Sequence, residues 1–212
     1  MTVSTSDALT TRSLRRLRGS FIGAYCTIQK YRENQSRIRM TQLPMNLTIR
    51  PERHGDEDAI GDVTRKAFES HPYSHQTEHF IIEALRKASA LSVSLVAEQG
   101  GIVVGHIAFS PVLIAHASSA WYGLGPVSVL PELQRKGIGR ALIEHGLAKV
   151  RECGGTGCVL VGDPAYYTRF GFANTPSLVL DGVPQEFFLS LSLGDSSARG
   201  QVTFHPAFDA KG

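Results

Sequence analysis

Cysteines and long hydrophobic runs are scarce in this 212-residue sequence. The three cysteines (Cys26, Cys153 and Cys158) are odd in number and lack the spacing of a metal site, which excludes a disulfide-stapled scaffold and indicates a reducing compartment. No apolar segment approaches the roughly 18 residues that cross a bilayer. We therefore expect a soluble, cytoplasmic protein that uses no metal and has no membrane association.

Acidic residues are also scarce in the first 44 positions, which hold eight bases and two acids. Taking these from the 22 bases and 19 acids of the whole chain leaves 14 bases and 17 acids for residues 45–212. The formal net charge of +3 therefore comes from the leader. Because a large basic surface is the usual footprint of nucleic-acid binding, we expect no nucleic-acid partner for residues 45–212.

The leader is rich in Arg, Ser and Thr and shows no sustained apolar period. Three interpretations remain open: a disordered tail, a mis-assigned start whose true initiator is Met40 or Met45, or a presequence for import into an organelle. We do not expect a secretory signal, because no apolar segment of about 7–15 residues precedes a small-residue cleavage site. We divide the chain into this leader, residues 1–44, and one domain, residues 45–212.

From residue 45 onward, strand and helix signals alternate. The predicted order is β-α-α-β-β-β-α-β-α-β-β, with a further possible helix around residues 184–191. A hairpin at Gly100-Gly101 followed by a β-α-β-α run indicates an α/β domain with one mixed sheet and helices on both faces. Strands are expected at residues 46–50, 91–98, 102–114, 121–130, 158–161, 178–180 and 201–204, and the two longer helices at residues 56–70 and 139–151.

The turn Gln134-Arg135-Lys136-Gly137-Ile138-Gly139 joins a strand to a helix. Free amides at a helix start point outward, and the helix dipole adds about half a positive charge there. The two glycines lack a Cβ, so an anion can approach the backbone. Further positive charge comes from Arg135, Lys136 and Arg140. The pattern favours a pyrophosphate site over the alternative of an ordinary turn with a solvated basic face.

Two other phosphate-binding patterns do not fit this turn. A Walker loop is absent because Gly137 is not followed by Gly-Lys-Ser/Thr. A dinucleotide fingerprint requires a third glycine at position 142, where the chain has Leu142. The turn therefore belongs to a different class of phosphate site.

Two motifs together resemble the GNAT superfamily of N-acetyltransferases. Val127-Ser-Val-Leu-Pro131 with the turn Gln134–Gly139 is similar to the acetyl-coenzyme A signature of that family, Gln/Arg-x-x-Gly-x-Gly/Ala. Ala165-Tyr-Tyr-Thr-Arg-Phe-Gly-Phe172 resembles its Tyr-x-Lys-x-Gly-Phe segment, with Arg in place of Lys. Gly162-Asp-Pro-Ala-Tyr-Tyr and Leu124-Gly-Pro126 resemble a bacterial subgroup of generically predicted N-acetyltransferases. The resemblance covers about residues 45–204.

The resemblance implies the GNAT acyl-CoA N-acyltransferase fold, in which the fourth and fifth strands splay apart and the pantetheine arm of acetyl-CoA lies in the gap. It implies that Tyr167 is the general acid that protonates the leaving thiolate. The Val129 N–H would stabilise the oxyanion, and Tyr166 is expected to face elsewhere. The cofactor-binding residues implied are Ser128, Val129, Leu130, Gln134, Arg135, Lys136, Gly137, Ile138, Gly139, Arg140 and Tyr167.

The expected reaction is direct attack of a primary amine of a small molecule or peptide on the thioester, through a tetrahedral intermediate. His106 is the first candidate for the general base. Other candidates are Asp163, Glu78, His71, His75 or water alone. A non-catalytic acyl-CoA-sensing module is the alternative function, and the partners expected are acyl-CoA and an amine, with a monomer or homodimer as the assembly.

Overall fold

The computed structural model describes residues 46–69, 74–117, 120–194 and 198–212. The expectations for the leader, residues 1–44, and for His71 lie outside these residues. Within the described ranges, no helix has both the length and the apolar character that crossing a bilayer requires.

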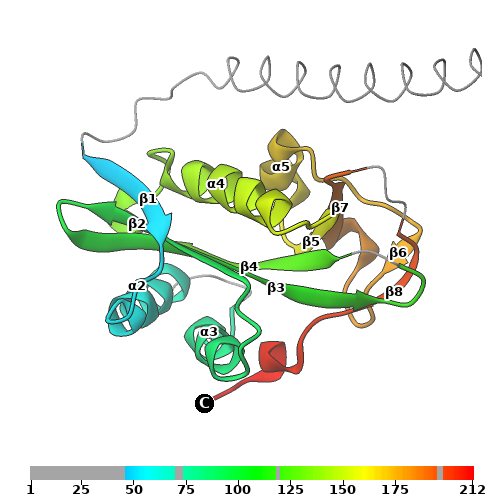
Figure 1. The fold of residues 1–212 in the computed structure, drawn as a ribbon, viewed down its shortest axis with the longest axis horizontal. Helices are drawn as coiled ribbons and strands as arrows, with labels where there is room; N and C mark the ends of the chain where they lie inside the picture. The colour runs from blue at the N-terminus through cyan, green and yellow to red at the C-terminus, as the bar shows by residue number, and fades with distance from the viewer. Residues whose placement is uncertain (1–45, 70–73, 118–119, 195–197) are drawn as a thin grey trace, which may run out of the picture. The chain divides into compact units, whose positions relative to one another are not determined.

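A mixed sheet of mostly antiparallel strands forms the centre of the domain (Figure 1). The strand order is β1-β2-β3-β4-β5-β7, and within this path only β4 and β5 are parallel. β8 pairs with the end of β3, and β6 pairs with β8. The strands are β1 (Leu47–Pro51), β2 (Val93–Gln99), β3 (Ile102–Ile114), β4 (Trp121–Val129), β5 (Gly157–Val161), β6 (Leu178–Val179), β7 (Phe188–Ser192) and β8 (Gly200–Thr203).

Helices cover both faces of this sheet (Figure 1). α2 (Glu57–Phe68) and α3 (Glu78–Lys87) lie on one face, and α4 (Ile138–Glu152) and the short α5 (Pro164–Tyr167) lie on the other. Acids in the first turn and bases in the last turn of α2 and α3 complement their helix dipoles. The α/β class, with one mixed sheet between two helical layers, is thus confirmed.

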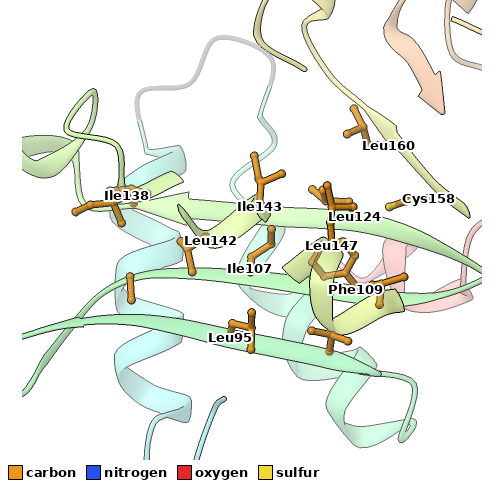
Figure 2. Packing of buried hydrophobic residues seen from close by; sticks show 14 of the residues in the cluster. Leu95, Ile107, Phe109, Leu124, Ile138, Leu142, Ile143, Leu147, Cys158 and Leu160 are labelled. Atoms are coloured by element: carbon orange, nitrogen blue, oxygen red, sulfur yellow. The ribbon is translucent and has the colours of Figure 1, made fainter. Parts of the chain in front are cut away.

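The main core lies between α4 and the sheet, as Figure 2 shows. Leu142 and Leu147 of α4 are buried in the same cluster as Ile107 and Phe109 of β3. Gly146 lets α4 approach the sheet closely, because a Cβ at this position would stand 2.3 Å from Phe109 Cε2. This packing holds the start of α4 in a fixed position beside the end of β4.

The possible helix around residues 184–191 is wrong. A single 3-10 turn, Gln185–Phe187, leads directly into β7, which pairs with β5 along its whole length. Phe188 and Leu189 are both buried although they point to opposite faces of the sheet. Burial on both faces gives a continuous apolar run without period-2 alternation, which is why the sequence pattern could not distinguish this strand from a helix.

Candidate functional site

β4 and β5 pair only at one end. Their register runs from Trp121 with Gly157 to Gly123 with Val159 and stops there. β4 continues to Val129, but no described strand pairs with its outer edge beyond Gly123. The register of β3 against β4 also shifts between Ile107 and Phe109, and such irregularities increase local twist. The result is a free strand edge that leads toward the start of α4.

The backbone groups that face this edge follow from the pairing with β3. The Leu130 N–H donates to Val104 O at 3.0 Å, so Leu130 faces β3. In an antiparallel strand successive residues face opposite sides, so Val129 faces the free edge and Ser128 faces β3. Ser128 also turns its side chain toward Thr64 of α2, with 3.1 Å between the two hydroxyl oxygens. The backbone groups of Ser128 and Leu130 therefore cannot pair with a ligand at the free edge, which corrects the prediction from the sequence. Those of Val129 can.

Sequence reasoning missed Val127. It lies two residues before Val129, so its N–H and C=O also face the free edge. The period-2 rule would have paired these two valines if the register of β4 had been known. The free edge thus presents two N–H donors and two C=O acceptors in succession.

Gln134 supports this edge from the turn. Its Nε2 donates a hydrogen bond to Val129 O at 3.1 Å. A carbonyl oxygen has a second lone pair, so Val129 can still accept from another donor. The side chain of Gln134 therefore fixes the turn to the strand instead of reaching outward.

The backbone of the turn is shaped to expose its amides. Arg135 and Gly137 have positive φ values of +60° and +88°. The first helical hydrogen bond runs from Ala141 N–H to Gly137 O, at 3.0 Å. Among the described residues, none of the six amides of residues 135–140 donates to a backbone carbonyl. Successive free amides at a helix start are groups that can donate to an anion, and the α4 dipole adds partial positive charge there.

The side-chain charges around the turn are less uniform. Arg135 and Lys136 are exposed, and within the described ranges neither forms an ion pair. Arg140 instead pairs with Glu144 one helical turn later, with 3.0 Å between Nε and Oε1. The first turn of α4 contains no acid, so no carboxylate on the helix opposes an anion there.

Tyr167 lies in α5, and its ring packs just beyond the end of β5. Its ring packs over Gly162, where a Cβ would stand 2.4 Å from Tyr167 Cε2, and it meets the Phe172 ring edge-on at 6.1 Å. Burial, then Tyr166 and Cys158, raise the pKa of the Tyr167 phenol. The hydroxyl therefore carries its proton at neutral pH, as a general acid must.

Tyr166 does not face away from the turn, and this expectation is corrected. A Cβ placed on Gly139 would stand 3.1 Å from Tyr166 Oη and 3.8 Å from Val129 Cγ2. The Tyr166 hydroxyl therefore lies over the first turn of α4, close to the end of the free strand edge. The cause is the short α5, which places neighbouring side chains about 100° apart around its axis.

His106 is removed as a candidate base. Its side chain is fully buried on the α2/α3 face, and Nε2 lies 2.8 Å from Ser94 Oγ. Burial, then the charge of Arg86, lowers the pKa of His106 to about 3. A buried imidazole with this pKa cannot collect a proton from an amine at neutral pH. Ser94 itself binds Glu52 and lines a surface hollow of about 470 Å³, which none of residues 134–140 lines.

The other candidate bases differ in their availability. Asp163 caps α5 and accepts a hydrogen bond from Ala165 N–H at 2.9 Å, so it has a structural role. His75 is exposed. Glu78 Oε1 accepts from Ser74 Oγ at 2.7 Å, while its Oε2 is buried and has no hydrogen-bond partner in the described part of the chain. Of these three side chains, only Glu78 has a buried oxygen without a hydrogen-bond partner among the described residues.

Comparison with known proteins agrees with this geometry. Residues 59–172 match the acetyltransferase (GNAT) family. The uncharacterized N-acetyltransferase YhbS of Escherichia coli K12 is 35% identical over 127 residues, which is 59% of this chain and 73% of YhbS. A GNAT family acetyltransferase from Brucella melitensis in complex with acetyl-CoA is 49% identical over 78% of this chain and 100% of its own, with a TM-score of 0.69. The structure of Escherichia coli YhbS in complex with CoA is 31% identical over 80% of this chain and 95% of its own, with a TM-score of 0.73.

Proposed function

Because the chain belongs to the acetyltransferase (GNAT) family, we propose that it moves an acetyl group from acetyl-CoA to a primary amine of a small molecule or peptide. The observation that carries the proposal is the row of six free amides at residues 135–140, next to the free edge of β4. Similar structures from Brucella melitensis and Escherichia coli hold acetyl-CoA and CoA, which supports the choice of cofactor.

The residues present fit the two polar parts of this cofactor. The amides of residues 135–140 would hold the pyrophosphate, with Arg135 and Lys136 adding charge at the surface. The pantetheine arm carries amide groups, and the N–H and C=O of Val127 and the C=O of Val129 would pair with them as a neighbouring strand does. Apart from Val129 O, which already accepts from Gln134 Nε2, these backbone groups lack a partner in the described chain. Because Val129 O has a second lone pair, binding breaks no existing hydrogen bond.

The chemistry requires one donor for the oxyanion and one for the leaving thiolate. The Val129 N–H faces the free edge and would donate to the thioester oxygen as the amine adds. Tyr167 would give its proton to the sulfur as the C–S bond breaks. The amine must lose a proton as the C–N bond forms, and Glu78 Oε2 or a water would accept it. No metal is needed for any of these roles.

A thermal-shift titration tests the proposal. A ligand that binds only the native state at about 100 times its Kd adds about 2.7 kcal/mol of stability, which corresponds to several degrees in Tm for a chain of this size. We expect such a shift with acetyl-CoA and with CoA, followed by thiol release when a panel of primary amines is added. No shift at millimolar acetyl-CoA would contradict the proposal. A shift without thiol release for any amine would favour the acyl-CoA-sensing alternative.

A further inference from the structure

The Tyr166 hydroxyl occupies a position that the acetyl-transfer chemistry does not use. It extends from α5 across to the first turn of α4, over Gly139 and beside the side chain of Val129. Its ring is held on two sides by edge-on contacts, with Tyr167 at 5.0 Å and Phe170 at 5.6 Å. Within the described part of the chain no hydrogen bond holds this hydroxyl, so packing of the ring sets its position.

Gly139 makes this position possible. A Cβ at 139 would stand 3.1 Å from Tyr166 Oη, which is tighter than ordinary van der Waals contact, so one of the two groups would have to move. Gly139 has no positive φ, so its backbone does not itself require glycine. The absence of a side chain at 139 thus serves the approach of the Tyr166 hydroxyl.

The charges around Tyr166 favour an anionic partner. The Arg169 guanidinium lies over the Tyr166 ring, 4.8 Å from its centroid. On the facing helix, Arg140 and Glu144 also act on the phenol, with Glu144 already paired to Arg140. Burial, the largest influence, raises the pKa of Tyr166, so the hydroxyl remains a donor at neutral pH.

We propose that Tyr166 is a cofactor-binding residue whose hydroxyl donates a hydrogen bond to the pyrophosphate of CoA, and that Gly139 is glycine to admit it. This inference rests on the proposed function, because it assumes that the amides of residues 135–140 hold the same pyrophosphate. It assigns to Tyr166 a role in affinity, and it leaves the proton transfer to Tyr167.

A double-mutant cycle on CoA binding tests the pair. Tyr166→Phe keeps the ring contacts and removes only the hydroxyl, so we expect the Kd of CoA, measured by calorimetry, to rise about tenfold. Gly139→Ala should raise the Kd by a similar factor because the methyl group displaces the hydroxyl. The double variant should also show about a tenfold rise instead of a hundredfold rise, because no hydroxyl remains to be displaced. Tyr122→Phe, a half-buried tyrosine at the other end of β4, is the control and should bind like the parent.

The outcomes separate this inference from the proposed function. If the parent binds CoA and Tyr166→Phe binds it equally well, or if Gly139→Ala costs the same factor in both backgrounds, the inference is wrong and the proposed function stands. If the parent does not bind CoA, both fail. Dephospho-CoA, which keeps the pyrophosphate but lacks the 3′-phosphate, should show the same tenfold ratio between parent and Tyr166→Phe. Loss of the ratio with dephospho-CoA would overturn the assignment to the pyrophosphate.

Discussion

The two faces of the sheet satisfy their polar groups in different ways. On the α2/α3 face, Glu52 pairs with Arg86 at 2.7 Å and binds Ser94, so charged and hydroxyl groups mostly find partners inside the protein. On the α4 face, six successive amides and one strand edge have no backbone partner among the described residues. Exposed backbone groups of this kind must be satisfied by water or by a ligand.

The comparison shows which feature marks a ligand site in this protein. The surface hollow of about 470 Å³ lies against the α2/α3 network, whose Glu52, Arg86 and Ser94 are already engaged with one another. A ligand there would have to replace existing contacts. The α4 face has more unpaired backbone groups, so we infer that unpaired donors are the better guide to the site.

The largest effect, on turnover, is expected at Tyr167 on the α4 face. A CoA thiol has a pKa near that of free cysteine, roughly 8.5, so its thiolate is already a fair leaving group. Acid catalysis should therefore contribute about 10²–10⁴-fold. We expect Tyr167→Phe to lower the turnover number by this range, measured by thiol release, with little change in acyl-CoA affinity. Turnover at the parent rate across pH 7–9 would show that water is the acid.

A large effect on affinity is expected at Gly137. Its φ of +88° lies in the left-handed region, so valine there adds backbone strain of about 1–3 kcal/mol and blocks the approach of an anion. We expect Gly137→Val to raise the KM for acetyl-CoA at least about tenfold. Gly154→Val is the matched control, because Gly154 has a φ of +78° at the other end of α4. If both variants change KM equally, strain in α4 and not the anion site explains the effect.

An intermediate effect, on stability alone, is expected from His106 on the α2/α3 face. The pKa of His106 is about 3 in the folded protein and about 6.5 in the unfolded chain, so the unfolded chain binds the extra proton between these values. Stability is thus complete above pH 6.5 and falls as the pH drops toward 3, by about 2 kcal/mol between pH 6.5 and 5.

Urea unfolding at pH 5 and pH 6.5 measures this loss. In His106→Gln the pH-dependent loss should shrink by about 2 kcal/mol, while the Kd of CoA at pH 7 stays at the parent value. A changed Kd would mean that the α2/α3 network reaches the cofactor site, and the contrast between the two faces would fail.

The smallest effect is expected from Arg135. Its side chain is exposed, and exposed charges are screened by salt and contribute only about 0–1 kcal/mol. We expect Arg135→Ala to raise the KM for acetyl-CoA a few-fold at low salt and less at 0.5 M salt. A greater loss than that of Gly137→Val would show that side-chain charge, and not the amides, dominates binding.

Local signals in the sequence predicted the strand-to-helix turn at residues 134–139 and the layered α/β architecture. Glycines and bases within six residues predicted the turn, and Gly137 indeed has the positive φ that only glycine adopts easily. The direction of the Ser128 backbone groups could not be predicted in this way. Whether they face β3 or the free edge depends on the register of β4, which shifts within the strand. A one-residue change in register exchanges Ser128 for Val129.

Tertiary contacts explain why the structure differs from the sequence-based expectations for His106 and Tyr166. The sequence placed His106 in a strand, where it could have served as a base. In the structure α2 and α3 cover that face and exclude His106 from solvent. The direction of Tyr166 depends on where α5 meets Gly139 of α4, two segments separated by a whole β-strand. No spacing rule in a single sequence predicts a contact between two such segments, so only the three-dimensional structure shows it.

The most direct test follows the backbone amides themselves. In a ¹⁵N–¹H NMR titration of the protein with CoA, we expect the N–H signals of residues 135–140 and of Val127 to move downfield, because each gains a charge-assisted or carbonyl acceptor. The N–H signals of Ser94 and His106, on the α2/α3 face, should not shift. If CoA binds while the signals of residues 135–140 do not move, the central claim that these amides hold the cofactor is wrong.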